Sequence, residues 1–153
     1  MAEHSGGRPV AEANLHLTLA FLGEVEAAEP VRTAAAMVVQ TEFEFSLDRY
    51  GYFAPARSVW IGPQRLPAAL MELQAQLWDQ LAAAGFPRES KPFRPHVTLA
   101  RKSPAPRAIA PPQPLVWRVK EFALIQSETA PTGARYQRLH QFQLLGPQTS
   151  IGL

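Results

Sequence analysis

The spacing of apolar residues along the chain predicts two helices that lie between strands. Five leucines recur every three or four residues, which places their side chains along one face of a helix over residues 66–84: Leu66, Leu70, Leu73, Leu77 and Leu81. Gly85 is well placed to end this helix. An alanine-rich stretch over residues 28–40 predicts a second, shorter helix.

The other apolar stretches are typical of strands, being short, rich in β-branched and aromatic residues, and bounded by turn residues. They cover residues 14–22, 43–53, 58–62, 95–101, 115–127 and 136–145. The stretches 43–53 and 58–62 are expected to pair as a hairpin. Because strands outnumber helices and the helices fall between them, we expect an α+β architecture with two antiparallel sheets that flank a groove.

The chain of 153 residues is the length of one domain with a substantial core. We expect a single domain over 1–153, with a flexible lead-in at 1–13 and a tail at 146–153. Five of the 15 prolines fall within residues 104–114, which predicts a stiff surface connection inside that domain.

Two of the predicted strands carry near copies of one pattern. The first is His16-Leu-Thr-Leu-Ala20 and the second is His96-Val-Thr-Leu-Ala100. Since successive side chains of a strand point to opposite faces, the histidine and threonine of each copy share one face and the leucine or valine between them faces the other. The repetition indicates two similar lobes, each of which offers one imidazole and one hydroxyl to a shared cleft.

Such a pair suits acid–base chemistry at a phosphate. An imidazole exchanges a proton near neutral pH, so one histidine can deprotonate a water while the other protonates a leaving oxygen. Threonine hydroxyls can donate hydrogen bonds to phosphoryl oxygens. A histidine in an apolar strand usually has only a structural role, but the same pattern found twice favours function.

Composition excludes several other classes of site. The chain has no cysteine, which rules out disulfides and cysteine-based metal sites and fits a cytoplasmic location. A zinc site would need more ligands near the motifs, yet the other histidines are only His4 and His140. We therefore expect no metal and no cofactor. A net charge of +2 tolerates a polyanionic substrate without indicating one.

The motifs and their surroundings resemble the 2H phosphoesterases. The longer runs Gly7-Arg-Pro-Val10, Asn14-Leu-His-Leu-Thr-Leu-Ala-Phe-Leu-Gly-Glu-Val25 and Phe93-Arg-Pro-His-Val-Thr-Leu-Ala-Arg101 are similar to the bacterial RNA 2′,3′-cyclic phosphodiesterases, also called 2′–5′ RNA ligases. The likeness extends from about residue 7 to residue 145. It implies a bilobal, pseudo-two-fold α+β fold with both histidines in a central, water-filled cleft.

The resemblance also implies a reaction and its residues. RNA 2′,3′-cyclic phosphate would be hydrolysed to a 2′-phosphomonoester without metal, with His16 as proton donor and His96 as proton acceptor. Thr18 and Thr98 would bind the phosphate. The two segments are too symmetric for the sequence itself to divide the acid and base roles.

A cation is also expected near the phosphate. Arg101 matches an arginine of the family, although strict alternation places it on the face opposite His96, whereas Arg94 shares the parity of His96. For stacking on a nucleobase, the candidates are Phe93, Tyr52 and Trp60, but core packing is the expected role of each, and of Trp60 above all because it lies between Val59 and Ile61. His140 is expected to be structural or exposed.

Family members usually carry an apolar strand and a helix ahead of the segment that corresponds to Gly7, and this chain lacks them. An unpaired sheet edge beside the first motif would favour a homodimer. Two further readings stay open: a binding module for RNA ends or nucleotides that does not turn them over, and reversal of the reaction to join RNA ends through a 2′–5′ linkage. No membrane association is expected.

Overall fold

The computed structural model describes residues 6–146 of the chain. Its helices are a short 3₁₀ helix, Glu12–Asn14, and two α-helices, α1 (Glu29–Ala35) and α2 (Ala68–Ala83). Its strands are β1 (Arg8–Pro9), β2 (Phe43–Leu47), β3 (Arg49–Phe53), β4 (Ser58–Gly62), β5 (Val97–Arg101), β6 (Leu115–Val119), β7 (Glu121–Ala130) and β8 (Gly133–Gln143).

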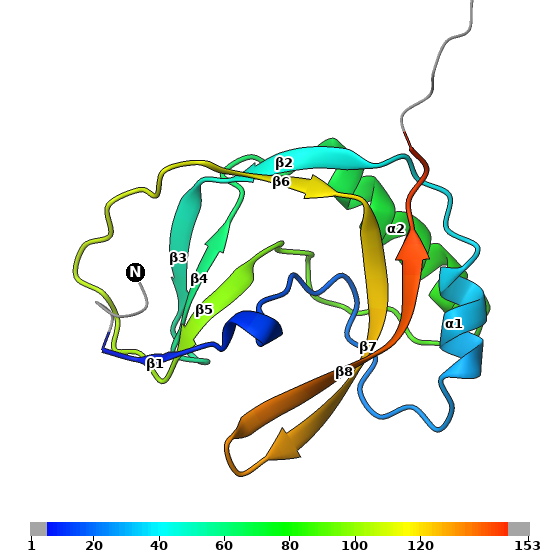
Figure 1. Cartoon of the computed structure of the whole chain (residues 1–153), viewed down its shortest axis with the longest axis horizontal. Helices are drawn as coiled ribbons and strands as arrows, with labels where there is room; N and C mark the ends of the chain where they lie inside the picture. Colours follow the sequence, from blue (N-terminus) through cyan, green and yellow to red (C-terminus); the bar gives the residue numbers. More distant parts are fainter. Residues whose placement is uncertain (1–5, 147–153) are drawn as a thin grey trace, which may run out of the picture.

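The strands form three antiparallel sheets within the described residues. One sheet has four strands in the order β1-β5-β4-β3, and the other two are the pairs β2-β6 and β7-β8. In Figure 1 the four-stranded sheet and the β7-β8 hairpin lie on opposite sides of the molecule, β2 and β6 run between them, and α2 lies behind. The α+β prediction is confirmed, with a third sheet beside the two that were expected.

Both predicted helices form, but each is shorter than its apolar pattern. Helix α2 starts only after Pro67, because proline lacks the N–H that a helix interior needs, so Leu66 stays outside it and is 59% exposed. Gly85 follows its end with φ at +97°, a conformation that glycine adopts readily. Helix α1 stops at Ala35 rather than continuing to Gln40.

The predicted strand over residues 14–22 is wrong. Asn14 belongs to the 3₁₀ helix, and the rest of the segment joins the sheet only through one antiparallel bridge, Leu17 to Val97. On the other edge of β5 the sheet continues into β4, but no described strand pairs with the outer side of this segment. A run of residues with strand propensity stays irregular when it pairs with a neighbouring strand at only one position.

The other predicted strands are confirmed, with adjusted boundaries. The stretch 43–53 divides at Asp48 into β2 and β3, which enter different sheets, and β3 pairs with β4 as the expected hairpin. The stretch 115–127 likewise divides at Lys120 into β6 and β7. Residues 104–114 contain no helix or strand, as expected of a connection.

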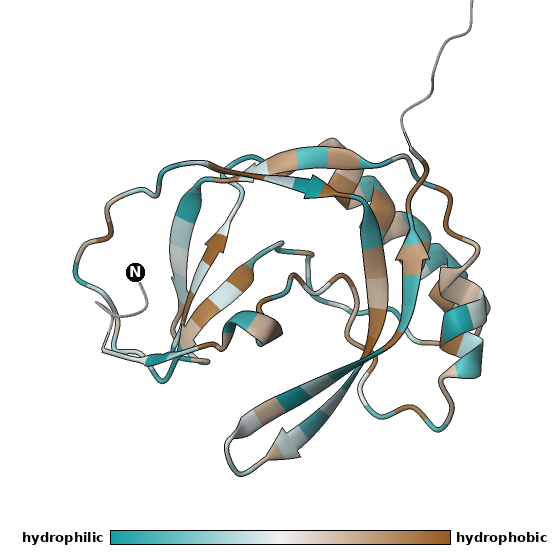
Figure 2. Cartoon of the chain, in the orientation of Figure 1, coloured by the Kyte–Doolittle hydropathy of each residue, from teal (hydrophilic) through white to brown (hydrophobic). Residues whose placement is uncertain are grey.

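The long β7-β8 hairpin extends beyond the body of the molecule. Its proximal half is anchored by Phe122 and Phe142, whose rings stack with centroids 4.9 Å apart. Its distal half is mostly hydrophilic (Figure 2) and passes close to the 3₁₀ helix, where the side-chain amide of Asn14 donates a hydrogen bond to the carbonyl oxygen of Ala134. Within the described part of the chain, no helix is both long enough and apolar enough to cross a membrane.

Candidate active site

The two His-x-Thr motifs meet at the Leu17–Val97 bridge. Both bridged residues pack into the same hydrophobic cluster, where Val97 is only 7% exposed. Because neighbouring residues of a strand alternate in direction, the histidines and threonines on either side face away from that core. The antiparallel register sets His16 across from Thr98 and Thr18 across from His96. We call these four residues the motif quartet.

Each imidazole is held in the same way by its own backbone. His16 Nδ1 lies 2.7 Å from the carbonyl oxygen of Asn14, and His96 Nδ1 lies 2.7 Å from that of Arg94. A carbonyl oxygen only accepts, so in each case Nδ1–H is the donor. Both rings therefore keep Nε2 as the nitrogen that is left to exchange a proton with a bound molecule.

Each imidazole also meets the edge of an aromatic ring. Tyr136 on β8 contacts His16 with centroids 5.1 Å apart and planes inclined at 70°, and Phe53 on β3 contacts His96 at 4.9 Å and 86°. The hydrogen bond from Nδ1 to the carbonyl oxygen and the contact with an aromatic ring together restrict each imidazole to one preferred orientation. The approximate two-fold symmetry of the quartet thus extends to its supports.

The two halves of the quartet differ in exposure. His16 and Thr18 are exposed, and His96 and Thr98 are half-buried. All four can therefore be reached by a bound molecule. Two imidazoles with available Nε2 atoms and two hydroxyl groups can transfer protons and donate hydrogen bonds to one anionic group set between them.

A β-bulge changes where Arg101 points. Trp60 pairs with Thr98, but the next residue of β4, Val59, pairs with Ala100, so Leu99 is an extra residue in β5. Val59 and Ala100 are fully buried and share the core face. Arg101, the next residue after Ala100, is therefore on the same face as Thr98. The expectation from strict alternation, which put Arg101 on the opposite face, is wrong because of this bulge.

Arg94 contributes to the site through its backbone. Its carbonyl oxygen accepts the hydrogen bond from His96, and its side chain is exposed. Arg101 is also exposed and stands directly across from Arg8 in the pairing of β1 with β5. Both arginines are thus available to an anion.

Of the aromatic candidates for stacking, only Trp60 lies on the face of Thr98. Tyr52 alternates to the other face and donates a hydrogen bond from its hydroxyl to the carbonyl oxygen of Ser103, and Phe93 packs against the core. His140 packs against the Phe142 ring with centroids 4.6 Å apart, in agreement with a structural role.

Reasoning from the sequence did not select Phe53 or Tyr136 as partners of the histidines. Their contacts depend on the pairing of β3 with β4 and of β7 with β8, which brings residues far apart in the sequence together. The aromatic character of both residues was the only available signal, and several core residues share it.

No other cluster within residues 6–146 competes with the quartet. No three of the histidine, aspartate and glutamate side chains there come together as metal ligands, and His4 lies outside the described residues. Two open hollows have volumes of about 450 and 350 Å³. The first is lined by residues 21–23 with 86–91, and the second by residues 45, 46 and 48 with 64–67. Neither hollow includes a residue of the quartet.

Comparison with known proteins agrees with this geometry. The RNA 2′,3′-cyclic phosphodiesterase of Escherichia coli is 39% identical over 142 residues, which cover 90% of this chain and 80% of that protein. The enzyme of the same name from Thermus thermophilus is 37% identical over 153 residues, covering 92% and 77%.

Solved structures show the same likeness. The apo structure of E. coli LigT superposes with a TM-score of 0.84 at 37% identity, covering 95% of this chain and 84% of that one. The complex of E. coli LigT with 3′-AMP gives 0.82 at 39% identity, covering 92% and 82%. Residues 2–131 also match the profile of one family. The family suggested by the motifs is thereby confirmed: this chain belongs to the 2′-5′ RNA ligase superfamily.

Proposed function

We propose that this chain hydrolyses RNA 2′,3′-cyclic phosphate ends to 2′-phosphomonoesters. The observation that carries the proposal is the bridge between Leu17 and Val97, whose register assembles two imidazoles and two hydroxyls on one surface. Relatives that are 32–39% identical over most of this chain are named for the same reaction. The E. coli relative has been solved with 3′-AMP and with ATP, which supports nucleotides as ligands of this chain as well.

The fixed tautomers define the path of the protons. His96 Nε2 accepts a proton from water as the water oxygen attacks phosphorus. The bond from phosphorus to the 3′ oxygen breaks, and that oxygen takes a proton from Nε2 of a protonated His16, so the phosphate stays on the 2′ oxygen. The assignment of acid and base follows the family resemblance, because the quartet is close to symmetric.

The other residues stabilise negative charge on the phosphoryl group. Thr18 and Thr98 donate hydroxyl hydrogen bonds to the non-bridging oxygens, which gain charge in the transition state. Arg101 supplies a positive charge from the face of Thr98, and Arg94 supplies another from the residue whose carbonyl orients His96. No step requires a metal ion.

One assay tests the proposal. The purified chain is incubated with adenosine 2′,3′-cyclic phosphate, with and without EDTA, and the product is identified by ³¹P NMR and chromatography. We expect adenosine 2′-phosphate at the same rate in both samples. A 3′-phosphate product, or loss of activity with EDTA that zinc or magnesium restores, would contradict the mechanism.

The same assay distinguishes the two alternatives. If the chain bound the cyclic phosphate without forming any product, it would be a binding module rather than an enzyme. Joining of RNA ends is the reverse reaction with a 5′-hydroxyl in place of water, and it requires the hydroxyl to be held at high effective concentration. We expect hydrolysis to dominate, and the cytoplasmic location stays a prediction.

We further propose that the chain forms a homodimer through the irregular segment beside the first motif. Leu15 and Phe21 are 42% and 69% exposed there, and within residues 6–146 the segment has backbone pairing on only one side. A second copy could cover both the apolar side chains and the unpaired edge. Sedimentation equilibrium should give twice the monomer mass, and Phe21→Ser should lower it; a monomer at all concentrations would disprove the dimer.

A further inference from the structure

The two motif histidines stand on backbones of different regularity. His96 directly precedes β5, which pairs with β1 on one side and with β4 on the other. His16 lies in an irregular segment that joins the sheet at the bridge from Leu17 to Val97. His16 is also exposed, whereas His96 is half-buried. A side chain with so little of its own packing is free to move unless another element holds it.

The distal half of the β7-β8 hairpin supplies contacts to the segment that carries His16. The side-chain amide of Asn14 donates a hydrogen bond to the carbonyl oxygen of Ala134 on β8, with Nδ2 and the oxygen 3.1 Å apart. Two residues further along β8, the ring of Tyr136 meets the imidazole of His16 edge-on, with centroids 5.1 Å apart. We call Asn14, Ala134 and Tyr136 the hairpin support.

Asn14 connects the hairpin to the imidazole through two of its own groups. Its backbone carbonyl oxygen accepts the hydrogen bond from His16 Nδ1, while its side chain holds β8. If the hairpin moved, it would displace both the acceptor that orients the imidazole and the Tyr136 ring that flanks it. The hairpin support therefore fixes the direction in which Nε2 of His16 points.

The matching contacts of His96 come from elsewhere in the fold. Its acceptor is the carbonyl oxygen of Arg94, and its aromatic neighbour is Phe53 on β3, a strand of the same sheet as β5. The β7-β8 hairpin is a separate sheet. A change in the hairpin support should therefore act on His16 and leave His96 as it was.

We propose that Asn14 and Tyr136 are positioning residues, through which the β7-β8 hairpin aims the imidazole of His16 at the leaving oxygen. This inference rests on the proposed function, in which His16 protonates the 3′ oxygen. It gives the hairpin a part in the proton transfer from His16 and none in the proton transfer to His96.

Two substitutions remove one contact each. Asn14→Ala removes the hydrogen bond to Ala134 but keeps the backbone carbonyl, and Tyr136→Leu removes the ring but keeps an apolar side chain. We expect each to lower kcat for adenosine 2′,3′-cyclic phosphate about 10-fold, because a small displacement of a catalytic group can cost up to about 100-fold. KM should change by less than about twofold, since neither residue binds the substrate.

Two further variants separate aim from general damage to the hairpin. Tyr136→Phe keeps the ring and should recover most of the activity that Tyr136→Leu loses. Gln137→Leu changes the next residue of β8, which is exposed and points to the other face of the hairpin, and it should retain native kcat. An equal loss in Tyr136→Phe and Tyr136→Leu would exclude the ring contact as the cause.

Double substitutions show which proton transfer depends on the hairpin support. A chain with His16→Ala has no imidazole to aim, so the addition of Asn14→Ala should lower kcat no further. In a chain with His96→Ala, the addition of Asn14→Ala should lower kcat about 10-fold, as it does in the native chain. Equal losses in both backgrounds would mean that Asn14 supports the site as a whole, and would overturn the proposal.

Nitrogen-15 NMR of the histidine rings gives a measurement that does not depend on turnover. In the native chain the neutral ring of His16 should carry its hydrogen on Nδ1. Asn14→Ala and Tyr136→Leu should each mix the two tautomers of His16 and leave the signals of His96 unchanged. If both variants kept the native signals of His16, the proposal would be overturned. If the native chain hydrolysed no cyclic phosphate, the proposed function would fail, but these signals would still decide whether the hairpin orients His16.

Discussion

The backbone around the two histidines is the same, and this likeness supports the proposal that they act as a pair. Each Nδ1–H donates to the carbonyl oxygen two residues earlier, Asn14 for His16 and Arg94 for His96. This bond fixes the tautomer of the neutral ring and directs Nε2 away from the chain. In both copies of the motif the accepting carbonyl lies two residues before the histidine, so each copy contains the group that orients its own imidazole.

Removal of either imidazole should remove one proton transfer. We expect His16→Ala and His96→Ala each to lower kcat for adenosine 2′,3′-cyclic phosphate by about 10²–10⁴-fold, the usual contribution of a positioned acid or base. Steady-state kinetics measures this, with thermal melts to confirm folding. The matched control is His140→Ala, whose ring packs on Phe142 outside the quartet, and it should retain native kcat. Native turnover in either motif variant would reject the mechanism.

At the scale of the element, the bulge in β5 decides which side chains join the site. The extra residue Leu99 keeps Ala100 in the core and returns Arg101 to the face of Thr98. Without it, Arg101 would have followed Val97 and Leu99 toward the other face. One inserted residue thus adds a cation to the quartet without disturbing the buried side of the sheet.

The contribution of Arg101 can be measured against its neighbour. We expect Arg101→Gln to lower kcat/KM about 10-fold or more, because hydrogen bonds to a charged group are worth about 1.5–3 kcal/mol. Lys102→Gln removes the same charge one residue later, beyond the end of β5, and should have a much smaller effect. Equal effects of the two substitutions would indicate a general influence of surface charge and would argue against a position at the phosphate.

A structural feature could be predicted from the sequence where its cause lies in neighbouring residues, and could not where the cause is contact with a distant segment. The histidines and threonines could be proposed as site residues because alternation and repetition are local patterns, and α2 was predicted from its leucine spacing. The bulge at Leu99 has no marker in the sequence, since leucine is ordinary in a strand. The failure of residues 14–22 to form a strand, and the contact of Phe53 with His96, both depend on which segments lie next to them in space.

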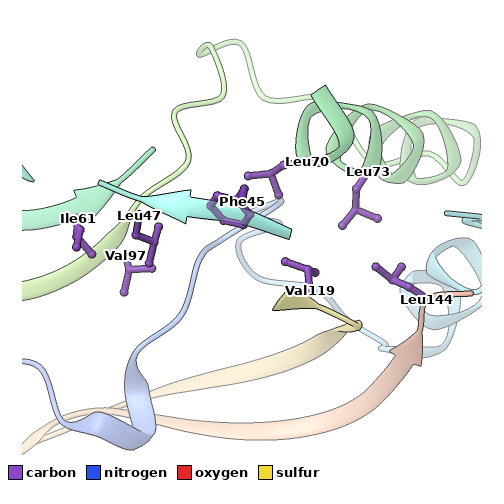
Figure 3. Close-up of a cluster of buried hydrophobic side chains, with 8 residues drawn as sticks. All are labelled: Phe45, Leu47, Ile61, Leu70, Leu73, Val97, Val119 and Leu144. Atoms are coloured by element: carbon purple, nitrogen blue, oxygen red, sulfur yellow. The ribbon is translucent and has the colours of Figure 1, made fainter. Parts of the chain in front are cut away.

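At the scale of the whole molecule, two hydrophobic clusters form the core that holds the elements of the site in place. Figure 3 shows the first, which joins β2, β4, β5, β6 and the start of α2: Phe45, Leu47, Ile61, Leu70, Leu73, Val97, Val119 and Leu144. The second joins α1, the rest of α2 and β8: Val31, Ala34, Ala35, Leu77, Trp78, Leu81 and Phe142. Helix α2 contributes to both clusters, and Leu19, Val38 and Phe122 pack against both.

Because these residues are shared, we expect the chain to unfold as one unit. Unfolding therefore tests the prediction of a single domain. Leu73→Ala in the first cluster and Leu81→Ala in the second each remove a side chain that is 1% exposed. Each should lower the free energy of unfolding by about 2–5 kcal/mol, the usual cost of such a cavity. Because the clusters are coupled, both substitutions should shift the same single transition to lower temperature.

Far-UV circular dichroism and tryptophan fluorescence measure this transition independently, since the first follows all elements and the second follows Trp60, Trp78 and Trp117. We expect the two signals to coincide in the native chain and in both variants. Leu66→Ala, at a position 59% exposed, is the control and should leave the midpoint nearly unchanged. Two separate transitions, of which each substitution shifted only one, would show that the clusters fold independently, and the quartet would then depend on the docking of two units.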